Sequence, residues 1–277
     1  MAGVENVEAV LKEADAFCVN GTAKLYGFEQ DEYFRQILQN PGLDVAFHNP
    51  LFSQVAAALP GNATIIDIGA NIGLTTIPSS RYLPQGRVIS IEPSPKIFSA
   101  LAKMTSANGL KNVTLVNKCI GEVAGQVPFV ENFDFLAGSY AGSDAREEST
   151  VMVEMITLDS LVRSERLDRI DLIKIDVEGF ELDVLKGGSF TLDNYNPIFV
   201  MEFNSFALTA NRNLSPRALL DFILDRFGSF SVLRQGEKYR ISTARAVRDF
   251  IYANMAMYGC VEDIVFGNET LISEISA

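Results

Sequence analysis

Carboxylates and amides gather at the ends of two predicted strands. Lys174, Asp176 and Glu178 alternate along the run DLIKIDVEG, so in an extended strand their side chains would point to one side together. Three polar residues on one side of a central strand cannot be apolar core. Glu202 and Asn204 end the next strand-like run, PIFVMEFN. A carboxylate at this edge can act as a general base, and the oxygens of Asp176, Glu202 and Asn204 are hard ligands that suit Mg²⁺.

Structural roles remain open for part of this group. Glu178 can cap the following helix or pair with Lys174, and Glu181 is open to the same interpretation. For Asp176 a functional role is favoured, because ligands bind at the edge where its strand ends. His48, the single histidine, is an alternative base with a better-matched pKa, or a structural residue.

A glycine-bearing turn follows the first clear strand. Residues 66–73 read IDIGANIG, in which Gly69 and Gly73 would let the backbone approach a ligand closely. The start of the next helix supplies free amide donors. The second strand ends in Glu92, about where an acidic side chain receives the two ribose hydroxyls of a nucleotide in such folds. A nucleotide-like ligand is therefore expected at the carboxyl ends of these strands, although the turn alone can also be purely structural.

The same turn distinguishes two ligand chemistries. A dinucleotide fingerprint needs G-x-G-x-x-G to meet a pyrophosphate, whereas Asn71 stands where the middle glycine belongs. S-adenosylmethionine has no phosphate and carries a positive sulfonium, so an acidic turn with Asp67 and Asn71 suits it better. The turn therefore favours S-adenosylmethionine over a dinucleotide.

Strand-like and helical patterns alternate from residue 61 onward. Strands are predicted over 64–69, 87–92, 113–117, 171–176, 197–203, 230–234 and 261–266, and helices near 74–83, 95–107, 180–187, 215–227 and 244–257. The alternation predicts an α/β, Rossmann-like fold with a seven-stranded, mostly parallel sheet and helices on both faces. Within residues 119–156, the runs GQVPFV and TVMVEMI predict extra strands that could cover the site.

The remaining sequence suggests one compact unit behind a lead-in. Residues 1–60 are predicted to form an N-terminal helical cap, with helices over 5–16 and 29–39, and residues 61–277 a single domain. No repeat and no low-complexity linker divides that domain.

Charge and composition exclude several classes of partner. The net charge is −12, from 23 Lys+Arg against 35 Asp+Glu, so no broad basic surface is available for nucleic acid or anionic lipid. No stretch approaches the roughly 18 apolar residues of a membrane span, and the N-terminus lacks a signal-like apolar region. Three widely spaced cysteines make no disulfide framework. We expect a cytoplasmic protein without membrane insertion.

The sequence resembles the FkbM family of methyltransferases. The resemblance rests on IDIGANIG at 66–73, IEPSP at 91–95, VNKCIGEVAGQVPF at 116–129, TLDSL at 157–161, IDLIKIDVEGFELDVLKGG at 170–188 and PIFVMEFN at 197–204. It implies a class I methyltransferase fold, S-adenosylmethionine as methyl donor, and most often O-methylation of a sugar or polyketide-type hydroxyl. Residues 1–60 and those beyond about 210 match no specific motif of the family. We expect these regions to determine which acceptor binds.

Carried over by position, the resemblance implies a donor pocket with Cys119 and Ile120 near the adenine. The implied donor-binding residues are Asp67, Gly69, Ala70, Asn71, Gly73, Glu92, Pro93, Cys119, Ile120 and Asp176. Methyl transfer is an in-line displacement in which the enzyme aligns the acceptor and removes its proton. Asp176 or Glu202 would take that proton, with His48 as the alternative, or would bind Mg²⁺ together with Asn204.

Two other functional classes stay open. One is a Rossmann-type oxidoreductase, which the absence of G-x-G-x-x-G argues against. The other is a non-catalytic S-adenosylmethionine-binding protein, which the presence of both Glu92 and Asp176 argues against. The expected acceptor is a small molecule or glycan, and neither its identity nor the oligomeric state follows from the sequence.

Overall fold

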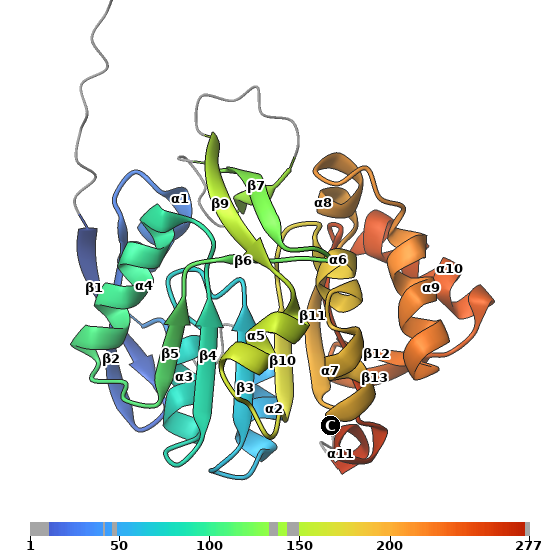
Figure 1. The fold of residues 1–277 in the computed structure, drawn as a ribbon, viewed down its shortest axis with the longest axis horizontal. Coiled ribbons are helices and arrows are strands. Elements are labelled where there is room, and N and C mark those ends of the chain that lie inside the picture. The colour runs from blue at the N-terminus through green and yellow to red at the C-terminus, as the bar shows by residue number, and fades with distance from the viewer. Residues whose placement is uncertain (1–10, 41, 46–48, 133–137, 143–149, 275–277) are drawn as a thin grey trace, which may run out of the picture.

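A single large sheet forms the centre of the protein (Figure 1). The computed structural model describes residues 11–40, 42–45, 49–132, 138–142 and 150–274. The sheet strands are β3 (Thr64–Ile68), β4 (Arg87–Ile91), β5 (Val113–Val116), β10 (Leu172–Ile175), β11 (Ile198–Asn204), β12 (Phe230–Arg234), β13 (Glu237–Ile241) and β14 (Val261–Gly267). Their order is β13-β12-β14-β11-β10-β3-β4-β5. The five strands from β11 to β5 are mutually parallel, and the other three pair antiparallel.

All seven predicted strands are present, but the predicted count of seven is wrong because β13 adds an eighth strand at the edge. Four of its five residues are exposed and it pairs only with β12, so its sequence lacks the apolar pattern of a core strand. By contrast, every residue of β3 and β10 is buried, as expected for parallel strands covered on both faces.

Helices cover both faces of the sheet, as predicted. They are α2 (Pro50–Ala58), α3 (Thr76–Tyr82), α4 (Pro95–Ala107), α5 (Leu158–Ser164), α6 (Glu181–Lys186), α7 (Ser189–Asn194), α8 (Ser205–Ala210), α9 (Pro216–Phe227), α10 (Ala244–Met257) and α11 (Glu269–Glu274). Ile66 and Ile173 pack in one core cluster with α5, α6, α9 and α10. Their neighbours Ile65 and Leu172 point to the opposite face and pack with α2. In the part of the chain that the structure describes, no helix combines the length and the apolar character that crossing a bilayer requires.

The N-terminal segment differs from the prediction. Residues 11–28 form an antiparallel hairpin of β1 (Leu11–Cys18) and β2 (Gly21–Phe28), so the helix predicted over 5–16 is wrong over residues 11–16. In β1 buried Ala14, Ala16 and Cys18 alternate with exposed residues, which is the period of a strand and not of a helix. The helix predicted over 29–39 is confirmed as α1 (Glu32–Gln39). In place of the predicted helical cap, the described part of residues 1–60 forms this hairpin and α1, which pack beside α4 (Figure 1), and α2, which packs on the main sheet.

The chain order creates a crevice between β3 and β10. From β3 the chain continues to β4 and β5 on one side, and β10 and β11 then lie on the other side of β3. Where neighbouring parallel strands lead away in opposite directions, their carboxyl ends leave room for a ligand. Asp67 near the end of β3 lies directly opposite Lys174 of β10 in the register.

A small second sheet covers this edge. Its strands are β6 (Cys119–Ile120), β7 (Gly125–Val130), β8 (Tyr140–Ala141) and β9 (Thr150–Ile156), in the order β6-β9-β7-β8. In Figure 1, β7 and β9 stand beyond the carboxyl ends of β3, β4 and β5. The extra strands predicted within residues 119–156 are confirmed.

Candidate active site

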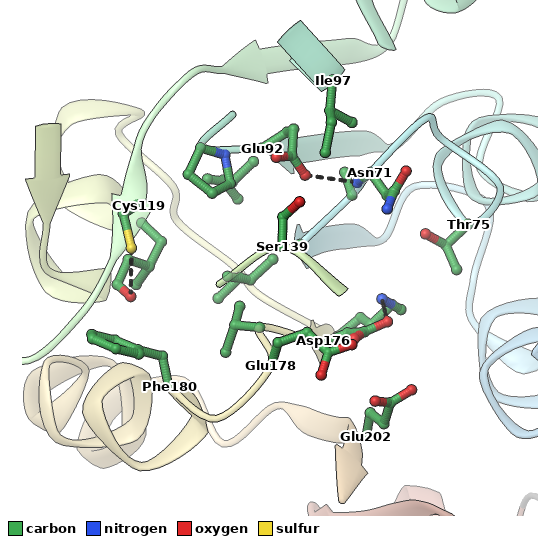
Figure 2. A pocket seen from close by; sticks show the side chains of 18 of the residues that line it. Asn71, Thr75, Glu92, Ile97, Cys119, Ser139, Asp176, Glu178, Phe180 and Glu202 are labelled. Atoms are coloured by element: carbon green, nitrogen blue, oxygen red, sulfur yellow. Dashed lines mark hydrogen bonds and ion pairs between the residues drawn. The ribbon is translucent and has the colours of Figure 1, made fainter. Parts of the chain in front are cut away.

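A cavity of about 440 Å³ lies at the crevice, under the small sheet (Figure 2). Most of the residues predicted to bind a donor or to act in catalysis line it: Gly69, Ala70, Asn71, Glu92, Pro93, Cys119, Ile120, Asp176, Glu202 and Asn204. In Figure 2, Glu92 and Glu202 lie at opposite ends of the view, with Asp176 between them. The fold thus brings the predicted donor-binding residues and the predicted catalytic residues together in one cavity.

Asp67 and Gly73 do not line this cavity. The fully buried Asp67 carboxylate accepts hydrogen bonds from the hydroxyls of Thr75 (2.7 Å) and Thr76 (3.0 Å) at the start of α3. At Gly73, where φ is +96°, a Cβ would lie 2.0 Å from the Cε of Met104 in α4. Asp67 therefore holds the turn onto its helix, and Gly73 allows the turn to pack on α4. His48, the alternative base, lies outside the described residues.

The turn after β3 requires a glycine. Gly69 has a φ of +82°, and a Cβ there would lie 1.8 Å from the carbonyl oxygen of Asp176, so only glycine lets the ends of β3 and β10 meet this closely. The backbone of Asn71 is also in the left-handed region, with φ at +49°. Its side-chain oxygen accepts a hydrogen bond from the N–H of Ile72 at 2.7 Å. Asparagine tolerates this conformation because its short side chain can bond locally.

Glu92 is held by two backbone amides. The N–H of Asn71 donates to Oε2 at 3.0 Å, and the N–H of Ser94 donates to Oε1 at 2.9 Å. Burial, with the nearby charges of Glu131 and Asp176, raises the pKa of Glu92 to about 8 against these two hydrogen bonds. Each oxygen keeps further accepting capacity, so the fixed carboxyl group can receive a vicinal diol from the cavity.

The cavity wall near Glu92 is mostly apolar. Pro93, Ile97, Ile120 and Phe129 contribute to it, and Cys119 adds a buried thiol. Burial raises the pKa of Cys119 to about 12, so the thiol stays neutral. Such a surface suits a flat aromatic base.

Asn117 does not line this wall. Its side-chain amide donates to the carbonyl oxygens of Glu92 (2.8 Å) and Pro93 (3.0 Å). Its role is to hold the backbone beneath the cavity.

At the centre, one lysine neutralises two carboxylates. Nζ of Lys174 donates to Oδ2 of Asp176 at 3.0 Å and lies 3.8 Å from Oδ1 of Asp67. Although burial lowers it, the pKa of Lys174 is raised overall by the charges of Asp176 and Asp67. The predicted partner Glu178 is not bonded to this lysine but accepts from the amide of Asn204 at 3.1 Å. Glu181, the first residue of α6, accepts the N–H of Gly179 at 3.1 Å, so it fixes the turn before the helix and does not cap the helix itself.

Three carboxylates converge at the other end of the cavity. Asp176, Glu178 and Glu202 can each bring one oxygen within 4.8 Å of the others, a spacing at which they could hold a metal ion. Burial raises the pKa of Glu178 to about 8, and the charge of Asp176 together with burial raises the pKa of Glu202 well above its ordinary value. The predicted ligand Asn204 is less suitable than Glu178, because its side-chain oxygen already accepts the N–H of Ala207 at the start of α8.

Four further lining residues come from the two ends of the chain. Tyr33 belongs to α1, Asn49 precedes α2, and Val261 and Asp263 belong to β14. No motif in the sequence marks them, because their place in the site depends on contacts between distant segments.

The comparisons with known proteins define the family. The model of the methyltransferase FkbM domain matches residues 67–240, more than half of the chain, and extends beyond residue 210, where the sequence shows no specific motif. The chain belongs to this family of methyltransferases.

Three relatives with assigned functions share about a third of their residues or fewer with this chain over the aligned part. The chain is 32% identical to the methyltransferase sdnD of Sordaria araneosa over 162 residues, which are 47% of this chain and 62% of that protein. It is 27% identical to the 2-O-methyltransferase NoeI of Sinorhizobium fredii over 207 residues, covering 69% and 82% of the two chains. It is 28% identical to the hexuronic acid methyltransferase AglP of Haloferax volcanii over 134 residues, covering 48% and 53%. The chain thus spans less than two thirds of sdnD.

Among solved structures, the protein is similar to an FkbM methyltransferase from Methylobacillus flagellatus KT. The TM-score is 0.46 and the identity 17%, over 74% of this chain and 44% of that one.

Proposed function

We propose that the protein transfers a methyl group from S-adenosylmethionine to a hydroxyl of a small molecule, either a sugar, a glycoside or a polyketide-like compound. The observation that carries the proposal is that one cavity has Glu92, held by two amides, at one end and the carboxylate of Glu202 at the other, with Asp176 between them. Membership of the FkbM family supports the reaction class. The relatives named as a 2-O-methyltransferase and a hexuronic acid methyltransferase support a sugar hydroxyl as the acceptor.

The residues present fit the donor chemically. Glu92 would accept the ribose hydroxyls, and the apolar wall with Cys119 and Ile120 would contact the adenine. The turn from Gly69 to Asn71, with Asp176 opposite, would receive the amino acid end. When bound, S-adenosylmethionine supplies a methyl group on a positively charged sulfur, and a cavity rich in carboxylates stabilises that charge.

Glu202 is the proposed general base. Its raised pKa makes its ionised form a stronger proton acceptor than an ordinary carboxylate, closer to what abstraction of a hydroxyl proton needs. Asp176 accepts a hydrogen bond from Lys174, which fixes its orientation. We therefore assign proton removal to Glu202 and orientation of the reacting groups to Asp176.

A divalent ion is the alternative use of the same carboxylates. Asp176, Glu178 and Glu202 would hold Mg²⁺, which prefers oxygen ligands and would polarise the acceptor hydroxyl. The general-base role is preferred here because Glu202 acts in it without a further component.

Calorimetry tests the donor. The protein is expected to bind S-adenosylhomocysteine and not NAD. Tight NAD binding without any response to S-adenosylhomocysteine would show a Rossmann-type oxidoreductase and overturn the proposal. Donor binding without methyl transfer to any hydroxyl in a broad set of sugars and glycosides would favour a non-catalytic binding protein.

A further inference from the structure

Segments outside the family match contribute to the end of the cavity around Glu202. Tyr33 and Asn49 precede residue 67, and Val261 and Asp263 follow residue 240, whereas the donor-side residues lie within 67–240. Lining residues that lie outside the matched domain, at the end of the cavity away from Glu92, are the natural place for acceptor selection. This end is called the acceptor lobe below, and comprises Tyr33, Asn49, Glu178, Glu202 and Asp263.

The acceptor lobe carries more negative than positive groups. Three of its residues are acidic, and Asp176 lies beside them. Of the lysines and arginines in the described part of the chain, only Lys118 and Lys174 line the cavity.

Both of these lysines already have carboxylate partners. Lys174 lies between Asp176 and Asp67. Lys118, next to Cys119 on the donor side, donates to Glu154 at 2.7 Å. Neither lysine belongs to the acceptor lobe.

Glu202 makes no hydrogen bond or ion pair with the residues that the structure describes. It lies on the cavity wall (Figure 2). Carboxylates so close together cannot all ionise without a compensating cation.

We propose that the acceptor lobe binds an amino sugar or another amino polyol, through the ammonium group of that acceptor. This proposal rests on the proposed function. The ammonium group donates hydrogen bonds to Glu202 and Glu178 and supplies the positive charge that these carboxylates lack. Acceptors with a carboxylate are repelled, because no cation of the lobe is available to them.

Binding of three sugars that share a pyranose ring tests the proposal. Protein saturated with S-adenosylhomocysteine is titrated with glucosamine, glucose and glucuronate at neutral pH, and binding is followed by saturation-transfer NMR. EDTA is present throughout, so that no divalent ion occupies the carboxylates. Glucosamine is expected to bind roughly ten-fold more tightly than glucose, since hydrogen bonds to charged groups are the stronger ones, and glucuronate is expected to bind most weakly.

Two variants and a matched control localise the effect. Glu178→Gln and Asp263→Asn should each reduce the preference for glucosamine over glucose. Glu269→Gln should leave this preference unchanged, because it removes an exposed carboxylate in α11 that pairs with Arg240 and does not line the cavity. Equal binding of glucose and glucosamine, preferred binding of glucuronate, or no binding of any of the three would overturn the proposal. Because donor binding is measured separately by calorimetry, such a result would leave the proposed methyl transfer standing.

Discussion

The backbone N–H of Asn71 donates a hydrogen bond of 3.0 Å to the carboxyl group of Glu92, so the turn after β3 and the end of β4 hold the same acidic side chain. The second oxygen is held by the N–H of Ser94, the residue that caps α4. A side chain restrained at both oxygens loses little freedom when it binds a diol, which favours affinity.

The first prediction follows from this arrangement. Above about pH 8, where Glu92 is ionised, Glu92→Ala should weaken S-adenosylhomocysteine binding by about ten-fold to over a hundred-fold, the size expected for lost hydrogen bonds to a charged group. Calorimetry on a variant shown to be folded by circular dichroism measures the change. An unchanged dissociation constant would mean that Glu92 does not contact the donor.

The second prediction concerns the buried charges around Lys174. Lys174→Met should lower the free energy of unfolding by about 3 to 5 kcal/mol, because it leaves Asp67 and Asp176 without their cation. Urea unfolding measures it. The control Lys186→Met removes an exposed pair with Glu122 and should cost about 1 kcal/mol or less. Equal stability of the two variants would argue against the buried cluster.

The third prediction separates chemistry from donor binding. Glu202→Gln preserves shape and should lower the methyl transfer rate by about two to four orders of magnitude with little change in donor affinity. Asp176→Asn should also lower the rate, because it disturbs the partner of Lys174. A folded double variant that methylates at the wild-type rate would move the search for the base to His48.

Chelation is the control for that experiment. If Glu202 acts as the base, wild-type activity persists in EDTA. Loss of activity that added Mg²⁺ restores would instead assign Asp176, Glu178 and Glu202 to a metal ion.

The fourth prediction concerns stability and pH. Burial raises the pKa to about 8 for Glu92 and Glu178, about 7 for Glu181 and about 6 for Asp263. In the unfolded chain the pKa of such carboxyl groups is about 4. At a pH between the unfolded and the folded pKa, the native state therefore binds more protons than the unfolded state. Their stabilising effect is complete below about pH 4 and is lost as the pH rises towards about 8.

The melting temperature of the free protein should therefore fall over that interval, by about 2 to 4 °C for each kcal/mol lost. Differential scanning calorimetry across the pH range measures it. Glu178→Gln should make the fall smaller. A melting temperature that rises from pH 5 to pH 8 would contradict the assignment of these buried groups.

Local patterns in the sequence were sufficient to predict the seven core strands, the turn at 66–73, the extra strands of the covering sheet and the position of Glu92. These features depend on neighbouring residues, such as the isoleucine-rich runs of β3 and β10 and the Ser94-Pro95 start of α4. The same patterns failed at β1, where an alternation of small and charged residues was interpreted as a helix.

Only the tertiary structure decided which side chains face the cavity. Asp67 lies in the most recognisable motif, yet packing turns it onto Thr75 and Thr76 and away from the ligand space. Lys174 lies opposite Asp67 because of the register of β10 beside β3. Tyr33 and Asp263 line the same cavity although they are far apart in the sequence. Spacing within one segment predicts which side of that segment a residue occupies, but the partner across a sheet or a cavity depends on how distant segments pack, and no local pattern contains that information.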